Sequence, residues 1–483
     1  MTALLIAGTT SDAGKTIVTT ALCRAFARRG LRVAPFKAQN MSNNSMVVGE
    51  GREIGRAQWV QALAAGVEPE VAMNPVLLKP GGDRRSHVVV MGQPAGEIAA
   101  SDFMGGRDHL AEAAYTAYDD LASRFDLVLC EGAGSPAEIN LRADDYVNMG
   151  LAQHASMPVV VVGDIDRGGV FAAMYGTVAL LDAADQRLMA GFVVNKFRGD
   201  QTLLRPGLDR LEKITGRRML GVLPWSPDVW LDSEDALDLE SRRSSDEGSL
   251  RVAVIRLPRI SNFTDVDALG IEPGVDVTFV ADPRSLADAD LIVLPGTRAT
   301  LADLTWLRAR GLDMAILDHV DEGRPVLGIC GGFQMLGRTI SDPEGVEGVR
   351  GAEVAGLGLL DVTTTFGSEK VLRLHDKGGY EIHHGRVDLG DVDEFLGGAH
   401  DHSVFGTMHH GSLESDEFRR AFLADAAEST GREFVQSTAS FAAARATRLD
   451  LLGDLAEEHL DLDALLALAR DGAPDVPLLP PGA

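Results

Sequence analysis

The first segment whose residues could do chemistry is the glycine-rich run Gly8-Thr9-Thr10-Ser11-Asp12-Ala13-Gly14-Lys15-Thr16. It follows the apolar run Ala3–Ala7 and opens a helical pattern that extends to about Arg28. Such a loop points backbone N–H groups at phosphate oxygens, and the dipole of the following helix adds positive potential. We therefore predict an ATP site in which Lys15 contacts the β- and γ-phosphates and the Thr16 hydroxyl binds Mg²⁺. The residues expected to line it are Gly8, Thr9, Ser11, Gly14, Lys15 and Thr16.

Two further charged residues fit this site. Glu131 ends the apolar run Asp126–Cys130, so its carboxylate lies at the carboxyl end of a strand, where open α/β sheets bind ligands. It is a candidate Mg²⁺ ligand, and the alternative is a solvated loop glutamate. Lys37 follows the run Arg32–Pro35 and could stabilise charge on a migrating phosphoryl group, although a surface lysine is an equally good interpretation.

The second segment with reactive residue types surrounds Cys330. Residues 325–337, PVLGICGGFQMLG, indicate a strand, a tight turn and a helix start, with Cys330 at the centre of G-x-C-x-G. This pattern is typical of a nucleophile elbow, and a thiol at a helix N-terminus favours the reactive thiolate. The N–H groups of Gly331 and Gly296 are candidates for an oxyanion hole. The alternative is an ordinary tight turn with an inert cysteine.

A thiolate nucleophile needs a partner that protonates the leaving group. The candidates are four histidines in two short glycine-flanked motifs. His409 and His410 stand in GTMHHG, and His383 and His384 stand in GYEIHHG. Spacing alone leaves the choice among the four open.

Elements that can position these residues recur along the chain. Short Val-, Leu- and Ile-rich runs alternate with helix-length segments, as expected for buried parallel strands. We predict an α/β fold of two tandem doubly wound domains, a P-loop NTPase-like sheet followed by a flavodoxin-like sheet. The expected divisions are a synthetase domain at 1–228, a polar linker at 229–249, a second domain at 250–428, and C-terminal helices with a disordered tail at 429–483.

Composition narrows the setting. The 483 residues carry a formal net charge of −26, a surface field that repels nucleic acid and anionic membranes. The cysteines, Cys23, Cys130 and Cys330, are far apart, which fits a reducing compartment and no disulfide framework. We expect neither a signal peptide nor a membrane span, and therefore a cytoplasmic protein.

The two reactive segments together carry a family resemblance. The Cys330 elbow with a downstream histidine resembles class I glutamine amidotransferases. Five residues separate Gly8 from Gly14, as in dethiobiotin-synthetase-like P-loop proteins. From residue 1 to about 425 the chain resembles the cobyric acid synthases. The motifs that carry this resemblance are KAQNMSNNS, EIGRAQ, MNPVLLKP, EGAGSPAEINL, GDIDRGGVFA, NKFRGD and GYEIHHG.

The resemblance implies a glutamine- and ATP-dependent amidation of the b, d, e and g carboxylates of adenosylcobyrinic acid a,c-diamide. It selects His410 as the catalytic histidine, and Ser412 stands where the wider glutaminase class has a glutamate. Which group orients His410 stays open, as does the oligomeric state. The small-molecule partners would be glutamine, ATP and a corrinoid. Candidate corrinoid contacts are Gln39, Asn40, Asn43 and Asn74.

Three other interpretations are compatible with parts of the pattern. A cobyrinic acid a,c-diamide synthase, or an amidotransferase acting on another polyacid, would share both sites. A P-loop switch ATPase would carry the second domain as an inactive scaffold. A dethiobiotin-forming carboxylase would leave every residue after 250 unexplained.

Overall fold

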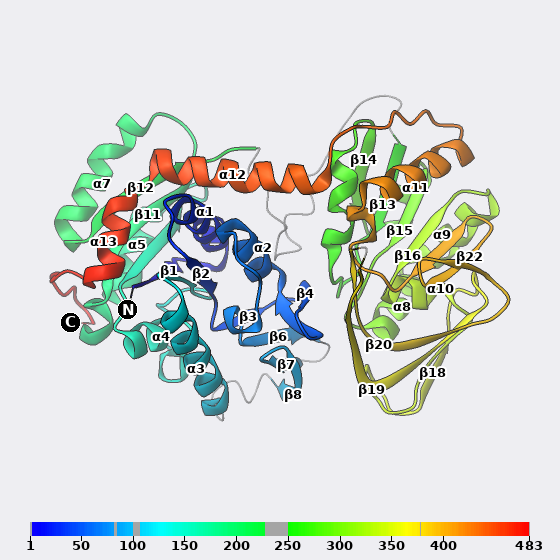
Figure 1. Ribbon diagram of the computed structural model, residues 1–483, viewed down its shortest axis with the longest axis horizontal. Helices are drawn as coiled ribbons and strands as arrows, with labels where there is room; N and C mark the ends of the chain where they lie inside the picture. Colours follow the sequence, from blue (N-terminus) through cyan, green and yellow to red (C-terminus); the bar gives the residue numbers. More distant parts are fainter. Residues whose placement is uncertain (1, 82–84, 100–106, 228–249, 377, 483) are drawn as a thin grey trace.

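The chain forms two lobes that are bridged by one long helix, α12 (Phe441–His459) (Figure 1). The computed structural model describes residues 2–81, 85–99, 107–227, 250–376 and 378–482. The predicted linker, 229–249, lies outside the described residues.

The first lobe is built on a parallel sheet whose strand order is β12-β11-β10-β1-β9-β2. Its strands are β1 (Ala3–Gly8), β2 (Val33–Phe36), β9 (Leu127–Glu131), β10 (Val159–Asp164), β11 (Met189–Phe197) and β12 (Arg218–Pro224). The central strands are buried along their whole length, which explains why they read as continuous apolar runs rather than alternating ones.

Helices cover both faces of this sheet. They are α1 (Lys15–Arg28), α2 (Arg56–Ala65), α3 (Asp108–Arg124), α4 (Met149–Ala155), α5 (Val170–Ala179), α6 (Ala183–Gln186) and α7 (Gln201–Thr215). Side chains of α3, α4 and α5 pack in one apolar cluster, and those of α1 pack in another on the opposite face. The glycine-rich loop connects the carboxyl end of β1 to the start of α1, at the edge of the sheet where a nucleotide is expected to bind.

Two small β structures project from the first lobe toward the second (Figure 1). One is a four-stranded sheet, and the other is a hairpin. The sheet contains β3 (Gln39–Met41), β6 (Val76–Pro80), β7 (Arg85–Val90) and β8 (Gln93–Ala99), and the hairpin contains β4 (Ser45–Val48) and β5 (Arg52–Gly55). The hairpin packs against two strands of the second lobe, β19 (Val362–Leu374) and β20 (Tyr380–Leu389).

The second lobe contains a seven-stranded sheet of order β14-β13-β15-β16-β23-β22-β21. Five strands are parallel, and the last two pair antiparallel at one edge. They are β13 (Leu250–Ile255), β14 (Val275–Val280), β15 (Leu291–Leu294), β16 (Val326–Ile329), β23 (Val404–Thr407), β22 (Gly398–Asp401) and β21 (Asp393–Phe395). Its helices are α8 (Thr300–Ala309), α9 (Leu312–Asp321), α10 (Gly331–Leu336) and α11 (Asp416–Ser429).

A four-stranded sheet lies beside the second lobe's main sheet, with the order β18-β17-β19-β20. Its strands are β17 (Thr339–Asp342), β18 (Ala352–Ala355), β19 (Val362–Leu374) and β20 (Tyr380–Leu389). The start of β20 joins the first lobe's core, because Tyr380 and Ile382 belong to the same apolar cluster as Met46 and Val47 of β4. This sheet therefore brings the two lobes together.

The C-terminal helices return to the first lobe. Leu449 and Leu452 of α12 and Leu465 of α13 (Leu462–Asp471) pack in the cluster that contains α1. The end of the chain differs from the expected disordered tail. Leu479 is buried, and its N–H donates to Gln186 Oε1 at 2.7 Å. The proline-rich composition of the tail predicted disorder, but composition does not reveal that an apolar side chain such as Leu479 packs against the first lobe.

The predicted α/β class with two domains is confirmed. β1, β2 and β9 begin and end within one residue of the predicted runs Ala3–Ala7, Arg32–Pro35 and Asp126–Cys130. The sequence pattern did not indicate the small sheets between the lobes or the return of α12. Within the ranges that the structure describes, none of the helices combines the length and hydropathy that crossing a bilayer requires.

Candidate active sites

The glycine-rich loop of the first lobe wraps around the Lys15 side chain. Lys15 Nζ donates to the carbonyl oxygens of Thr10 at 2.8 Å, Ser11 at 3.0 Å and Gly134 at 3.2 Å. Gly14 has φ of 92°, and a Cβ there would lie 2.0 Å from Asn195 Nδ2, so both conformation and space require glycine. The loop therefore gathers an ammonium group and a helix N-terminus at one point, as phosphate binding requires.

Glu131 is the centre of a buried network next to this loop. Its Oε1 accepts hydrogen bonds from Thr16 Oγ1 and from Lys37 Nζ, each at 2.9 Å, and its Oε2 accepts one from Gln61 Nε2 at 2.6 Å. Burial acts to raise the pKa of Glu131, but Lys37, together with Gln61 and Lys15, holds it below its ordinary value. Neither the solvated-glutamate nor the surface-lysine interpretation fits this site, because Glu131 and Lys37 are both buried.

The Thr16 hydroxyl and the Glu131 carboxylate fit a magnesium ion. Both are hard oxygen donors, which Mg²⁺ prefers, and they lie 2.9 Å apart at the carboxyl end of β9. Sequence reasoning missed Gln61, which comes from α2 and holds the other carboxylate oxygen. It also missed Asp164 at the end of β10, which accepts a hydrogen bond from Lys196 at 2.9 Å. The position of Asp164 at a strand end was the available signal.

The four candidate corrinoid contacts lie in different environments. Asn74 is buried, and its amide bonds the backbone of Lys37, Val76 and Gly55, which favours a role in positioning the loop. Asn40 Nδ2 donates to Gln58 at 3.2 Å. Gln39 Oε1 accepts from both Tyr146 Oη and Arg107 Nη2 at 2.5 Å. Asn43 instead lines a cavity that reaches Cys330.

Cys330 lies at a strained turn between β16 and α10. Its φ of 50° and ψ of −107° are rarely adopted by a residue with a side chain. The flanking glycines make this turn possible. A Cβ on Gly332 would lie 1.8 Å from the Leu294 carbonyl oxygen, and one on Gly328 would lie 2.8 Å from the Phe333 backbone. The predicted elbow geometry is therefore present.

His410 faces Cys330 and is held by Asp265. Its Nδ1 lies 2.7 Å from Asp265 Oδ2, and its ring interacts electrostatically with Cys330, whose Sγ lies 4.0 Å from the Ile382 carbonyl oxygen. Asp265 Oδ1 accepts from the Gly411 N–H at 2.8 Å, so this carboxylate fixes both the ring and its backbone. Burial acts to lower the pKa of His410, but Asp265 and Cys330 raise it to about 10. The arrangement can supply a proton to a leaving group at neutral pH.

The sequence left open which group orients His410, and in the structure Asp265 holds this position. It comes from η6 (Phe263–Ile271), 145 positions before His410, and nothing in its local sequence marks it. The rival histidines are held by other groups, although His383 and His384 line the same cavity as Cys330. His384 Nδ1 lies 3.2 Å from the Gly367 carbonyl oxygen. His409 Nε2 is 3.6 Å from Glu381, and His383 hydrogen-bonds Glu381 and the Gly385 carbonyl.

The two candidate oxyanion groups lie beside the reactive pair. A Cβ on Gly331 would lie 3.1 Å from Thr297 N, and one on Gly296 would lie 3.0 Å from His410 Cε1. The loop after β15 therefore lies against both the elbow and the histidine.

Residues of both lobes line the cavity at Cys330. Asn43 and Lys79 come from the first lobe, and Ser261, Gln334, Lys370 and His383 come from the second. Glu53 forms ion pairs with Lys79 and Lys370, so one buried carboxylate joins the lobes beside this cavity. Burial acts to raise the pKa of Glu53, but the two ammonium groups hold it below its ordinary value.

Comparison with known proteins finds two family models that match successive parts of the chain. Residues 4–238 match the CobQ/CobB/MinD/ParA nucleotide binding domain family, and residues 251–418 match the CobB/CobQ-like glutamine amidotransferase domain family. Cobyric acid synthases of Mycobacterium marinum, Mycolicibacterium gilvum and Mycobacterium tuberculosis are each 68% identical to the chain, with 100% of both chains covered. The chain belongs to the cobyric acid synthase family.

As a cobyric acid synthase family member, the chain is an amide-forming ligase of cobalamin biosynthesis with a glutamine amidotransferase domain. The predicted family resemblance and enzyme class are confirmed. Among solved structures, a glutamine amidotransferase covers 37% of the chain at 19% identity with a TM-score of 0.28, a likeness too low to carry any statement about function.

Proposed function

We propose that the chain amidates the b, d, e and g side-chain carboxylates of adenosylcobyrinic acid a,c-diamide, with ATP and with ammonia taken from glutamine. The product would be adenosylcobyric acid. The observation that carries this proposal is the presence of two buried reactive networks on one chain, Lys15–Thr16–Glu131–Lys37 and Cys330–His410–Asp265. One suits phosphoryl transfer, and the other suits amide cleavage.

Glutamine cleavage proceeds in two steps in this scheme. The Cys330 thiolate attacks the side-chain amide carbon, and the N–H groups of Gly331 and Gly296 stabilise the oxyanion. His410, held by Asp265, gives its proton to the nitrogen, so that ammonia leaves and a γ-glutamyl thioester remains. Water then attacks the thioester and releases glutamate and the thiolate. His410 accepts the proton of that water, and the site returns to its starting state.

Amide formation uses the first lobe. A corrinoid carboxylate attacks the γ-phosphate of ATP, which gives an acyl phosphate and ADP. Ammonia then attacks the acyl carbon and displaces phosphate, and the amide remains. Lys15 and Lys37 lie where they can neutralise charge on the transferring group. Thr16 and Glu131 would hold Mg²⁺, which neutralises phosphate charge when bound.

The cavity that both lobes line supports direct use of the ammonia. Asn43 lies in the loop that precedes the β4–β5 hairpin of the first lobe, and it shares this cavity with Cys330. Ammonia released at Cys330 would therefore share this cavity with two polar first-lobe side chains, Asn43 and Lys79. We propose that it passes along this side of the interface to the acyl phosphate.

The test is mass spectrometry of adenosylcobyrinic acid a,c-diamide incubated with the full-length chain, Mg²⁺-ATP and amide-¹⁵N glutamine. We expect stepwise gain of labelled amides until all free side-chain carboxylates are converted. Cobyrinic acid, tested in parallel, separates this assignment from an a,c-diamide synthase. Glutamine hydrolysis with no change in mass of either corrinoid would overturn the substrate assignment and leave the amidotransferase chemistry intact.

A further inference from the structure

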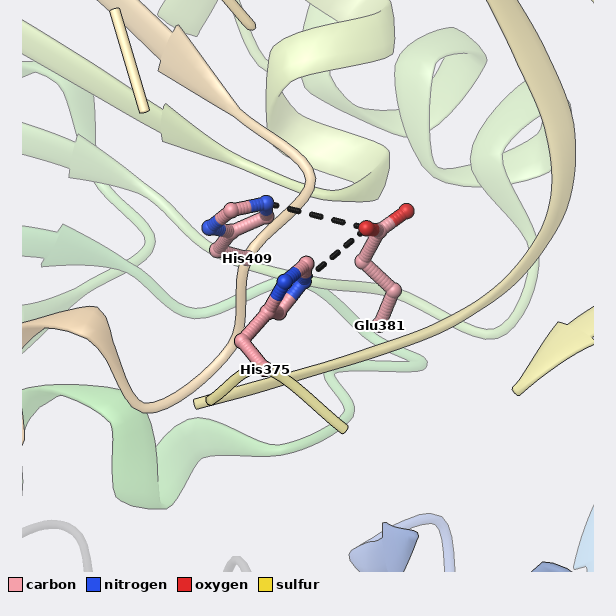
Figure 2. Close-up of side chains that lie close together, drawn as sticks. All are labelled: His375, Glu381 and His409. Carbon is pink, nitrogen blue, oxygen red and sulfur yellow. Dashed lines mark ion pairs between the residues drawn. The ribbon is translucent and has the colours of Figure 1, made fainter. Parts of the chain in front are cut away.

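A cluster of two histidines and one glutamate lies next to the glutaminase site and takes no part in the chemistry described above. His375, Glu381 and His409 point toward one another, with all ligand atoms within 4.8 Å (Figure 2). His375 follows β19, Glu381 belongs to β20, and His409 lies in the loop after β23. The β19–β20 hairpin therefore supplies two of the three side chains, and the loop after β23 supplies the third.

The spacing of the donor atoms suits a small divalent ion. Glu381 Oε1 lies 2.9 Å from His375 Nε2 and 3.6 Å from His409 Nε2. A tetrahedral zinc ion with bonds of about 2.1 Å holds neighbouring donors about 3.4 Å apart, between these two values. The 2.9 Å approach of the buried His375 Nε2 to the carboxylate lies outside hydrogen-bond geometry. Within the described residues this nitrogen forms an ion-pair contact with Glu381 but no hydrogen bond, so its lone pair can bind a ligand.

The surroundings of Glu381 favour the same interpretation. His383 Nε2 lies 2.9 Å from Oε2 and its Nδ1 lies 2.7 Å from the Gly385 carbonyl oxygen, so this histidine fixes one carboxylate oxygen and leaves Oε1 toward the cluster. Such supporting hydrogen bonds are typical of metal ligands. Arg373 approaches Oε1 at 3.4 Å but is 64% exposed, so it can turn into solvent when a cation binds.

We propose that His375, Glu381 and His409 bind a divalent transition-metal ion of the zinc class, with solvent as the remaining ligand. Two imidazole nitrogens and one carboxylate prefer Zn²⁺ over Mg²⁺ or Ca²⁺. The ion has a structural role. Tyr380 and His410 exchange backbone hydrogen bonds of 3.0 and 2.8 Å, and their chain neighbours Glu381 and His409 are metal ligands. The metal therefore secures the segment that carries His410 to β20.

The test is calorimetric titration of Zn²⁺ into tag-free, metal-stripped, full-length Cys330→Ser protein, in which the reactive thiol cannot compete for metal. We expect one equivalent to bind and this binding to be lost in His375→Ala and in His409→Ala. His383→Ala should weaken it by about 10- to 100-fold, since only a supporting hydrogen bond is removed. His384→Ala is the matched control, because His384 contacts Gly367 rather than the cluster, and it should bind like the parent.

Hydrogen exchange supplies a second measurement that does not depend on the variants folding. Zn²⁺ should slow exchange of the parent protein in the segments around 375–381 and 404–411, and should leave α12 unchanged. Equal zinc binding by the parent, His375→Ala and His409→Ala would overturn the proposal. Unchanged exchange in both segments at saturating Zn²⁺ would overturn the structural role.

Discussion

The two reactive regions of the chain use buried charge in different ways. Around the phosphate loop, Glu131 is paired with Lys37, and Lys15 bonds loop carbonyl groups, so ATP must exchange these internal bonds for its own. Around Cys330, the catalytic groups already lie together, because Asp265 holds the His410 ring and this ring interacts with Cys330. The first region therefore holds its cations in bonds to protein groups, whereas the second holds its reactive groups next to one another, as catalysis requires.

The strongest way to break this comparison is to inactivate each region separately. Lys15→Ala should lower both glutamine- and ammonia-dependent amidation by about 10³-fold or more, because the phosphate loses its cation. Cys330→Ser should lower only the glutamine-dependent reaction by a similar factor and should keep the reaction with added ammonium chloride. Amide formation measured with each nitrogen source tests both variants. Loss of the ammonia reaction in Cys330→Ser would show that the regions are not separable.

The role of Asp265 sharpens the description of the second region. Asp265→Asn should lower the kcat of glutamine hydrolysis by about 10³- to 10⁴-fold with little change in KM, since it holds the histidine but does not contact the glutamine. Ser412→Ala is the control, because that position holds a glutamate in the wider class and is not bonded to His410 in the described contacts of this chain. A normal rate in Asp265→Asn would assign the orientation of His410 to another group.

The junction between the regions provides the next test. Glu53→Gln leaves Lys79 and Lys370 buried without their shared carboxylate, and we expect a loss of about 3–5 kcal/mol in the free energy of unfolding. Denaturant unfolding measures this loss. Glu369→Gln is the control, because Glu369 is 89% exposed and, among the described residues, pairs with Arg386 at the surface, where a change below about 1 kcal/mol is expected. Equal stability of both variants would show that the junction does not depend on this charge.

The chemistry that uses local sequence was predictable, and the chemistry that uses distant residues was not. The phosphate loop and the Cys330 elbow each depend on a strand, a turn and a helix start within about fifteen residues, and backbone geometry dictates their glycines. Asp265 and Gln61 reach their sites only through the tertiary fold, from η6 and α2. The same holds for the His375, Glu381 and His409 cluster, whose members share no motif.

The Lys37 ion pair shows the same limit for charged residues. From the sequence, a surface lysine and a site lysine were equally good interpretations, because a single lysine after a strand has no distinguishing pattern. Its partner, Glu131, is 94 residues away and follows another strand. Parallel strands place their carboxyl ends at one edge, so the pair is reasonable once strand order is known. The order of the strands in the sheet cannot be predicted from the local periodicity of the sequence.

The smallest expected effect concerns two glutamates, the buried Glu131 and the half-buried Glu347, whose pKa values move in opposite directions. Burial raises the pKa of Glu347 to about 7, despite Arg298 and hydrogen bonds from Thr300. Its contribution to stability is therefore present below its ordinary value of 4.5 and is lost as the pH rises through about 7. Glu131 has a lowered pKa, so its contribution is present above 4.5 and is lost as the pH falls through its folded-state value.

Substitution by glutamine should therefore have opposite pH dependences in the two regions. Between pH 5 and pH 8, Glu347→Gln should gain up to about 3 kcal/mol in unfolding free energy relative to the parent, because it no longer buries a charge. Glu131→Gln should be less stable than the parent at pH 8, where Lys37 loses its partner, and this deficit should shrink toward acid. Urea unfolding at both pH values measures the two differences. If the stability difference from the parent changed with pH in the same direction for both variants, buried charge would not distinguish the two regions. They would then differ only in the geometry of their reactive groups.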